Sequence, residues 1–477
     1  MAPATNPTGS FSTKFFYGLG SIAFGVKDNG FQALLLIFYN QALGLDARLA
    51  GLAIAIALVV DAIIDPMIGY ASDHLHTRWG RRHPFMYGAA LPVAFSYLLL
   101  FAPPSGLGQQ GLFAYLLVTA ILVRGFIALY EVPSAALVAE LTQGYDQRTA
   151  YLSFRYFFGW VGGLTMGVVA FGVFLNRAQS GVAGTLIPAN YHAYGWLASA
   201  IMLVAILASS LGTHRCIPWL NRPAIREGRF SVGSGLRDVA QALASRSAAT
   251  ILLAGMLYAL ATGLVFSMAP YFYTYFWALT PGQTSILLAG SFISAGIALP
   301  LAPKLSRVFD KRQASIGVTV LIIATTPVSL VLSLLGLFPA NGAPAQMPYL
   351  FISGMISTTM LIIQGVLFTA MLADVVEENE VRTGQREEGV FFAANLFVQK
   401  CVSGLGVFAS AGLLTLAGFP AHADAASIPA ETLTRMGQIY VAVIVALNLL
   451  SMTCVTLFRI DRTTHAQNMA ILADRRN

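Results

Sequence analysis

Charged residues are scarce in this chain of 477 residues: aspartate, glutamate, lysine and arginine together make up 10%, whereas 56% is hydrophobic. A soluble domain carries about 25% charged residues, so water cannot solvate most of the surface of this chain. The hydrophobic residues form long runs separated by short polar segments, a pattern typical of helices that cross a bilayer. The composition therefore excludes a soluble globular protein and predicts a helical membrane protein.

Cysteines and the motifs of common enzymes are also few. The three cysteines are an odd number, and two of them fall in hydrophobic runs, so we expect no structural disulfide. The sequence contains no H-E-x-x-H, no G-x-S-x-G and no phosphate-binding loop. We therefore expect neither an enzyme nor an ATP-driven pump, and no cofactor. The histidines near the second hydrophobic run are only a weak candidate for a metal site, so no metal is expected: His74, His76 and His83.

Twelve hydrophobic stretches are long enough to span a membrane as helices. They cover residues 15–44, 49–73, 84–103, 111–141, 150–176, 191–213, 248–278, 283–303, 314–338, 348–375, 389–418 and 436–459. We predict an all-α membrane protein whose twelve transmembrane helices form two six-helix bundles. The first bundle would comprise residues 1–213, a cytoplasmic linker residues 214–247, and the second bundle with a short cytoplasmic tail residues 248–477.

Lysine and arginine are distributed unevenly between the two sides of these spans. If the N-terminus lies inside, 21 of them fall in inner segments and three in outer segments. Cytoplasmic loops carry such an excess, so we expect both termini in the cytoplasm and the chain in a bacterial inner membrane. The same bias, together with anionic lipid headgroups, explains the sequence pI near 9.3, and we expect no nucleic-acid partner.

A short internal repeat supports the division into halves. Ala139-Glu140 follows the fourth span and precedes Arg148-Thr149, and an equivalent Ala-acid pair and Arg-Thr pair follow the tenth span 234 residues later. Parallel repeats build carriers whose substrate site lies near the membrane midplane. We therefore predict a secondary carrier, and we expect it to be a monomer.

Eight ionisable residues fall inside the predicted spans, where each costs about 2.5–3.5 kcal/mol at a helix centre. They are Lys27, Asp28, Asp61, Asp65, Arg124, Glu131, Arg155 and Lys400. They must pair, face a hydrated cavity or titrate. Four are acidic and four basic, which permits static ion pairs between helices, but seven lie in the first half, which favours a binding site.

Asp61 and Asp65 are four residues apart and lie on one face of the second span. Two carboxylates this close cannot both stay ionised without a cation, a proton or a basic neighbour, so they are candidates for a coupling-ion site. Alternatively, one is bonded to an arginine or lysine while the other stays protonated. Arg124 and Glu131 share a face of the fourth span, whereas Arg155 could instead extend its side chain to the cytoplasmic interface.

The second span ends in Gly69-Tyr-Ala-Ser-Asp73, and the loop continues with Arg78-Trp-Gly80-Arg81-Arg82. This resembles the G-x-x-x-D and R-x-G-R-R signature of the major facilitator superfamily. The resemblance implies a gating loop that latches the cytoplasmic side in outward-open states. Asp73 can bridge helix ends there, while the arginines face the anionic inner leaflet.

A second resemblance is more specific. Asp61-Ala-Ile-Ile-Asp65-Pro-Met-Ile-Gly69 is similar to the D-A-x-x-D-P-x-x-G segment of the melibiose permease family, the glycoside–pentoside–hexuronide:cation symporters. Further similar segments run from Gly20 to Asp28, from Glu131 to Thr149, and from Met371 to Phe392. The resemblance covers nearly the whole chain and implies symport of a small sugar with a proton or a sodium ion.

The resemblance also implies roles for individual residues. Asp28 and Glu131 would accept hydrogen bonds from substrate hydroxyls, and Asp61 and Asp65 would bind the coupling cation. The other candidates for the substrate site, including the eleventh-helix lysine of the family, are Lys27, Arg124, Arg155 and Lys400.

Three departures from the family pattern bear on the coupling ion. Ile64 replaces an asparagine between the two acids, Ala128 replaces a hydroxyl residue before Glu131, and Leu58 replaces an arginine. A sodium ion needs several oxygen ligands whereas a proton needs one carboxylate, so the hypothesis is proton coupling. Two other functions remain open: a carrier of a lysolipid, terpenoid or drug, and a sugar-sensing receptor, for which the tail is too short to hold a signalling domain.

Overall fold

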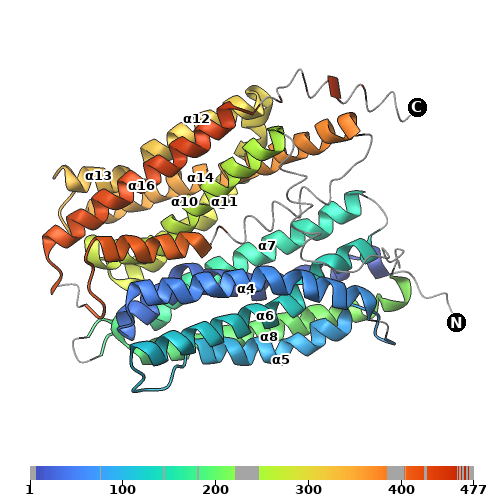
Figure 1. The fold of residues 1–477 in the computed structure, drawn as a ribbon, viewed down its shortest axis with the longest axis horizontal. Coiled ribbons are helices and arrows are strands. Elements are labelled where there is room, and N and C mark those ends of the chain that lie inside the picture. Colours follow the sequence, from blue (N-terminus) through green and yellow to red (C-terminus); the bar gives the residue numbers. More distant parts are fainter. Residues whose placement is uncertain are drawn as a thin grey trace. The chain divides into compact units, whose positions relative to one another are not determined.

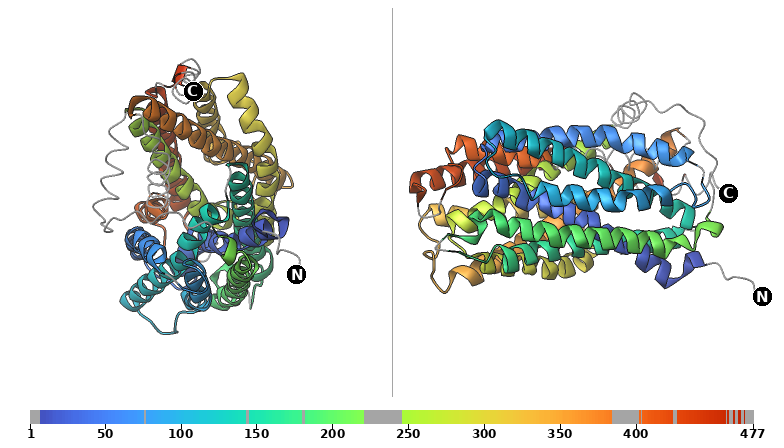
Figure 2. Two further views of the ribbon diagram at one scale, coloured as in Figure 1. Left: turned by 90° about the vertical axis from the view of Figure 1, so that its right-hand side faces the viewer. Right: turned by 90° about the horizontal axis from the view of Figure 1, so that it is seen from below.

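The computed structural model describes residues 7–75, 77–142, 145–179, 182–220, 246–383, 402, 404–423, 427–458, 460, 464, 467–468 and 471. These residues are helical apart from their connections and one bridge between Gln179 and Val182. The chain divides into two compact units, Met1–Phe230 and Ser231–Asn477. Figure 1 labels the helices, and Figure 2 gives two further views of the same ribbon.

Within the described residues, ten helices are long and apolar enough to cross a membrane. They are α4 (Ala47–His74), α5 (His83–Leu100), α6 (Gln109–Leu141), α7 (Tyr145–Val169), α8 (Pro188–His214), α10 (Arg246–Tyr271), α11 (Pro281–Val308), α12 (Lys311–Thr325) with α13 (Val328–Leu334), α14 (Gln346–Thr383) and α16 (Ala430–Thr456). Besides these ten, the described residues hold an interrupted helix at residues 11–42 and a shorter apolar helix, Gly404–Leu416. The first part of the predicted eleventh span, residues 389–401, lies outside the described residues. The predicted all-α membrane fold is confirmed.

The first span is not the continuous helix that its hydropathy predicts. It consists of α1 (Phe11–Leu19), α2 (Ser21–Asn29) and α3 (Leu35–Ile37), with π turns η2 (Gly30–Leu34) and η3 (Phe38–Ala42) on either side of α3. In a π turn each amide bonds to the carbonyl five residues back, and such turns occur often at functional sites. Here η2 begins directly after the Lys27-Asp28-Asn29 segment.

Helices α2 and α7 approach each other at backbone contact. A methyl group added to Gly25 would lie 2.0 Å from the carbonyl oxygen of Gly159, and one added to Gly163 would lie 2.8 Å from the carbonyl oxygen of Gly25. Only glycine allows this approach, which is the G-x-x-x-G mode of packing between membrane helices. The contact holds the helix that carries Arg155 against the helix that carries Asp28.

One buried cluster of the second unit joins α10 to α14 and α16. Ile251 and Leu252 on α10 belong to one buried cluster with Met371 on α14 and Val455 on α16. The ninth span is broken between α12 and α13 at Pro327, which has no amide hydrogen to continue the helical bonding.

Candidate functional site

The first predicted acid of the coupling pair, Asp61, is bonded to an arginine on the neighbouring helix. Arg124 Nη1 on α6 donates to Asp61 Oδ2 on α4 across 2.9 Å. Both side chains are buried, with 8% and 6% of their surface exposed, respectively. The Phe31 ring lies 4.7 Å from the Arg124 guanidinium carbon and covers it as a cation–π partner. The structure therefore brings Arg124 to the coupling pair.

The second acid, Asp65, lies one helical turn further along α4 and is partly exposed, whereas Asp61 is 4% exposed. Ile64 beside it packs on α6, with its Cδ1 at 3.5 Å from the position that a Cβ on Gly125 would take. The two acids thus differ in surroundings: Asp61 is enclosed with a guanidinium, whereas Asp65 is partly exposed as a residue but has its Oδ1 buried.

Lys27 and Asp28 form an ion pair of chain neighbours on α2, with 2.6 Å between Lys27 Nζ and Asp28 Oδ1. The Lys27 side chain is 6% exposed and the Asp28 side chain 46%. The buried ammonium group of Lys27 is therefore paired with a carboxylate that is partly accessible. This carboxylate can accept hydrogen bonds from a polar solute.

Arg155 on α7 contacts both α2 and α6. Its Nη1 donates to Ser134 Oγ at 3.3 Å, its guanidinium carbon lies 5.4 Å from the centre of the Phe24 ring, and Glu131 is an electrostatic neighbour. The Arg155 side chain thus lies between α2 and α6 and is partly buried. Its partner Phe24 precedes Asp28 by four residues, about one helical turn of α2. Lys400 lies outside the described residues.

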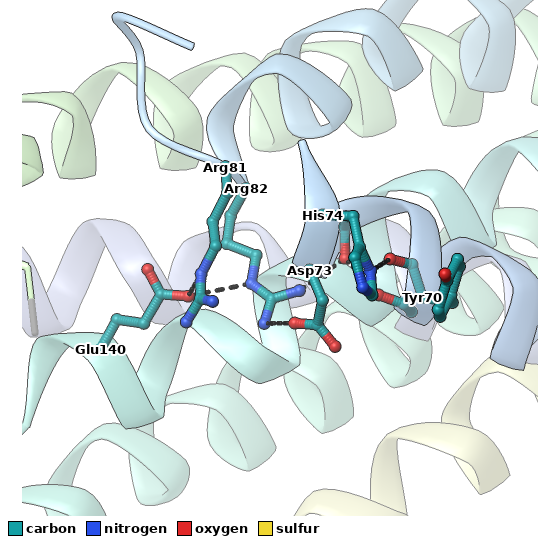
Figure 3. Close-up of polar contacts among 8 residues, drawn as sticks. Tyr70, Asp73, His74, Arg81, Arg82 and Glu140 are labelled. Atoms are coloured by element: carbon teal, nitrogen blue, oxygen red, sulfur yellow. Dashed lines mark hydrogen bonds and ion pairs between the residues drawn. The ribbon is translucent and has the colours of Figure 1, made fainter. Parts of the chain in front are cut away.

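The predicted gating loop forms a compact ion-pair cluster (Figure 3). Arg81 Nε and Arg82 Nε both donate to Glu140 Oε1 on α6, at 2.8 and 3.0 Å, and Arg82 also bonds to Asp73 at the end of α4. Glu140 is 2% exposed. The loop is therefore tied to the C-terminal ends of α4 and α6 by one buried carboxylate and one partly exposed carboxylate.

The turn within the gating loop depends on Gly80. Its φ of +77° lies in the left-handed region, which glycine adopts without strain. Thr77 Oγ1 donates to the Gly80 carbonyl oxygen at 2.7 Å and closes the turn. Arg78 does not join the ion-pair cluster, because its guanidinium lies over the Trp79 ring at 5.5 Å.

The second unit repeats this ion pairing at the matching acid of the internal repeat. Lys311 Nζ at the start of α12 lies 2.5 Å from Asp374 Oδ1 on α14, and Asp374 is 5% exposed. No group of three or more histidine, cysteine, aspartate or glutamate side chains that could hold a metal ion occurs in the described part of the chain.

Two features escaped prediction from the sequence. The glycines of α7 contact α2, and their spacing of four (Gly159, Gly163, Gly167) is a signal that could have identified this contact. The sequence left open that one of the two acids is bonded to an arginine or lysine, and Asp61 is so bonded. It did not identify Arg124 as the partner, since helical spacing does not say which neighbouring helix a face contacts.

Comparison with known proteins identifies transport proteins as relatives of this chain. A family profile described as MFS/sugar transport protein matches residues 16–462. The isoprimeverose transporter of Lactiplantibacillus pentosus is 23% identical over 454 residues, which cover 93% of this chain and 89% of that protein. The uncharacterized symporter sll1374 of Synechocystis is 36% identical over 166 residues, which cover 34% of this chain and 30% of that protein.

Solved structures show the same fold at low sequence identity. The D-xylose-proton symporter matches with a TM-score of 0.61 and 14% identity, over 92% of this chain and 97% of that one. The inward-open xylose transporter XylE of Escherichia coli matches with a TM-score of 0.60 and 16% identity, over 97% and 99%.

Proposed function

Because the chain belongs to the MFS/sugar transport family, and is therefore a multi-pass membrane transporter, we propose that it carries a glycoside or related sugar in symport with a proton. The protein would lie in a bacterial inner membrane. Both chain termini would be in the cytoplasm, which the 21-to-3 bias of basic residues towards inner segments favours. The curated relatives named above are a symporter and an isoprimeverose transporter by name.

The observation that supports a polar substrate is the Lys27–Asp28 pair. A lysine and an aspartate in the first span are costly unless they serve a hydrated site. Asp28 keeps 46% of its side-chain surface exposed although Lys27 is buried beside it. In our proposal Asp28 and Glu131 accept hydrogen bonds from sugar hydroxyls, and Lys27 and Arg155 orient the ligand.

Proton coupling is supported by what surrounds the two acids of α4. Ile64, Ala128 and Leu58 stand where sodium-coupled relatives have polar side chains, and Ala128 and Leu58 are 1% and 4% exposed. Hard cations are held by several oxygen ligands, which these side chains do not supply. Protonation of the acid pair would remove a buried negative charge and favour reorientation of the loaded carrier.

Uptake into right-side-out membrane vesicles tests the proposal. Labelled glycosides, pentosides and hexuronides would be offered with either an inward pH gradient or an inward sodium gradient. We expect accumulation of one of these sugars with the pH gradient alone. Accumulation driven by sodium without a pH gradient would overturn proton coupling, and uptake of a lysolipid, terpenoid or drug with none of the sugars would overturn the substrate class.

A further inference from the structure

A hollow of about 680 Å³ lies where the loop before α5 meets the end of α8. The described residues that line it are Trp79, Tyr87, Leu211, His214 and Arg215. The ring centres of Trp79 and Tyr87 lie 5.8 Å apart, and those of Tyr87 and His214 lie 5.9 Å apart. The hollow therefore has aromatic walls and one arginine, and these lining residues include none of the proposed substrate or coupling residues.

Hydrogen bonds hold these walls in place. The Tyr87 hydroxyl donates to the Ser210 carbonyl oxygen at 3.1 Å and lies 3.0 Å from His214 Nδ1. Arg215 Nη2 donates to the Thr13 hydroxyl at 3.3 Å, which ties this arginine to the first span. Because the first unit itself holds these side chains, the hollow is preformed, as ligand sites usually are.

Two guanidinium groups at the hollow have no carboxylate partner among the described residues. Arg78 lies over the Trp79 ring at 5.5 Å, and the side-chain hydrogen bonds of Arg215 go to hydroxyl groups. The other two arginines of the loop are instead bonded to Glu140. A guanidinium is well suited to phosphate, because its planar fork of donors can bind two oxygens at once. The exposed positive charge at the hollow therefore favours an anionic ligand that carries a phosphate.

Apolar side chains beside these charges are exposed. Trp79 is 42% exposed, and Leu211 in the last turn of α8 is 63% exposed. Helix α8 is long and apolar enough to cross a membrane, so its exposed apolar side chains can contact acyl chains. Tryptophan and tyrosine concentrate where acyl chains give way to headgroups, and basic pockets between membrane helices bind anionic headgroups at this level.

We propose that this hollow binds one anionic phospholipid. Its phosphate contacts Arg78 and Arg215, and an acyl chain lies along Leu211. A zwitterionic lipid fits less well, because its ammonium group meets two guanidiniums, one of which already covers the Trp79 ring that could otherwise bind a cation. The bound lipid links the gating loop to α8. This inference goes beyond the transport of a solute, and only its assignment to the inner leaflet rests on the proposed orientation of the chain.

Binding of two lipids with identical acyl chains to the purified, delipidated protein tests the proposal. Native mass spectrometry would measure the affinities for phosphatidylglycerol, which is anionic, and for phosphatidylcholine, which is zwitterionic. We expect the wild type to bind phosphatidylglycerol roughly tenfold more tightly, because each basic residue adds to the attraction of an anionic lipid. The double variant Arg78→Gln with Arg215→Gln should lose this preference. The matched control Lys304→Gln removes an exposed lysine near the end of α11 and should keep it.

Equal affinity of the wild type for the two lipids, or an unchanged preference in the double variant, would overturn the proposal. Displacement of the bound lipid by an equal concentration of inorganic phosphate would also overturn it, since that result identifies a site for the free anion. If the double variant does not fold, the wild type decides through phosphatidylglycerol that carries a photoreactive group. Crosslinks to residues 78–87 and 211–215 support the proposal, and crosslinks confined to other segments overturn it. These measurements do not involve sugar uptake, so their failure is distinct from failure of the proposed function.

Discussion

Glu140 on α6 and Asp374 on α14 form the same kind of ion pair in the two units. Each is the acid of the repeated Ala-acid pair, and each is almost fully buried. Each also binds basic residues at or just before the start of an earlier helix of its own unit: Arg81 and Arg82 before α5 for Glu140, and Lys311 of α12 for Asp374. The sequence repeat therefore preserves an interaction, although the bases and their number differ between the units.

This difference predicts unequal effects of removing the two acids. Breaking a buried ion pair by removing one partner costs about 3–5 kcal/mol, because the remaining charge is left unpaired. Glu140→Gln leaves Arg81, which is 12% exposed, without its carboxylate, and Arg82, which is 7% exposed, with Asp73 alone. Asp374→Asn leaves a lysine that is 29% exposed and better solvated. We expect Glu140→Gln to lower the midpoint of thermal unfolding in detergent more than Asp374→Asn does. Equal shifts, or a shift of the same size for the exposed control Arg48→Gln, would contradict this account.

The second prediction concerns Asp28. Hydrogen bonds to charged groups contribute about 1.5–3 kcal/mol each, so Asp28→Ala should weaken substrate binding roughly 10- to 100-fold or abolish it. Equilibrium binding of the transported sugar to the purified protein is the measurement. Glu431→Ala removes an exposed acid at the start of α16 and should bind normally. Unchanged affinity in the Asp28 variant would remove this residue from the substrate site.

The third prediction tests the contact between α2 and α7. Gly25→Ala places a methyl group against the Gly159 carbonyl, and overpacking of this kind typically costs about 1–3 kcal/mol. Gly88→Ala on α5 is the matched control, because no heavy atom lies within 4 Å of its added Cβ. We expect a lower yield and a lower unfolding midpoint for the Gly25 variant alone. Two variants of wild-type stability would show that the helices are not in backbone contact.

The fourth prediction concerns the thiol of Cys216, which follows α8. Burial raises the pKa of this thiol above its ordinary value, and the side chain is fully buried. The thiolate is the reactive form, so a raised pKa leaves less of it at neutral pH and labelling should rise as the pH rises. With Cys401 and Cys454 replaced by serine, we expect slow maleimide labelling at pH 7 and fast labelling after denaturation. Equal rates in the two states would contradict the buried position.

The sequence predicted the helical spans well because hydrophobic length is a direct requirement of the bilayer. It also placed Asp61 and Asp65 on one face of α4, since that relation depends only on helical spacing. It could not predict that Arg124 reaches Asp61, because the rotation of α6 against α4 depends on packing along both helices. The same spacing argument grouped Arg124 with Glu131, and the structure shows Arg124 bonded to the neighbouring helix.

The π turns at η2 and η3 have a practical consequence for choosing mutations in the first span. A helical wheel drawn from Asp28 with ordinary α periodicity assigns the wrong direction to every residue after Leu34, because each π turn accommodates an additional residue. Tyr39, for example, is fully buried and donates its hydroxyl to the Leu100 carbonyl oxygen at 2.9 Å. Scanning experiments on the part of this span that follows Leu34 should therefore be planned residue by residue from the coordinates and not by extrapolating a periodicity.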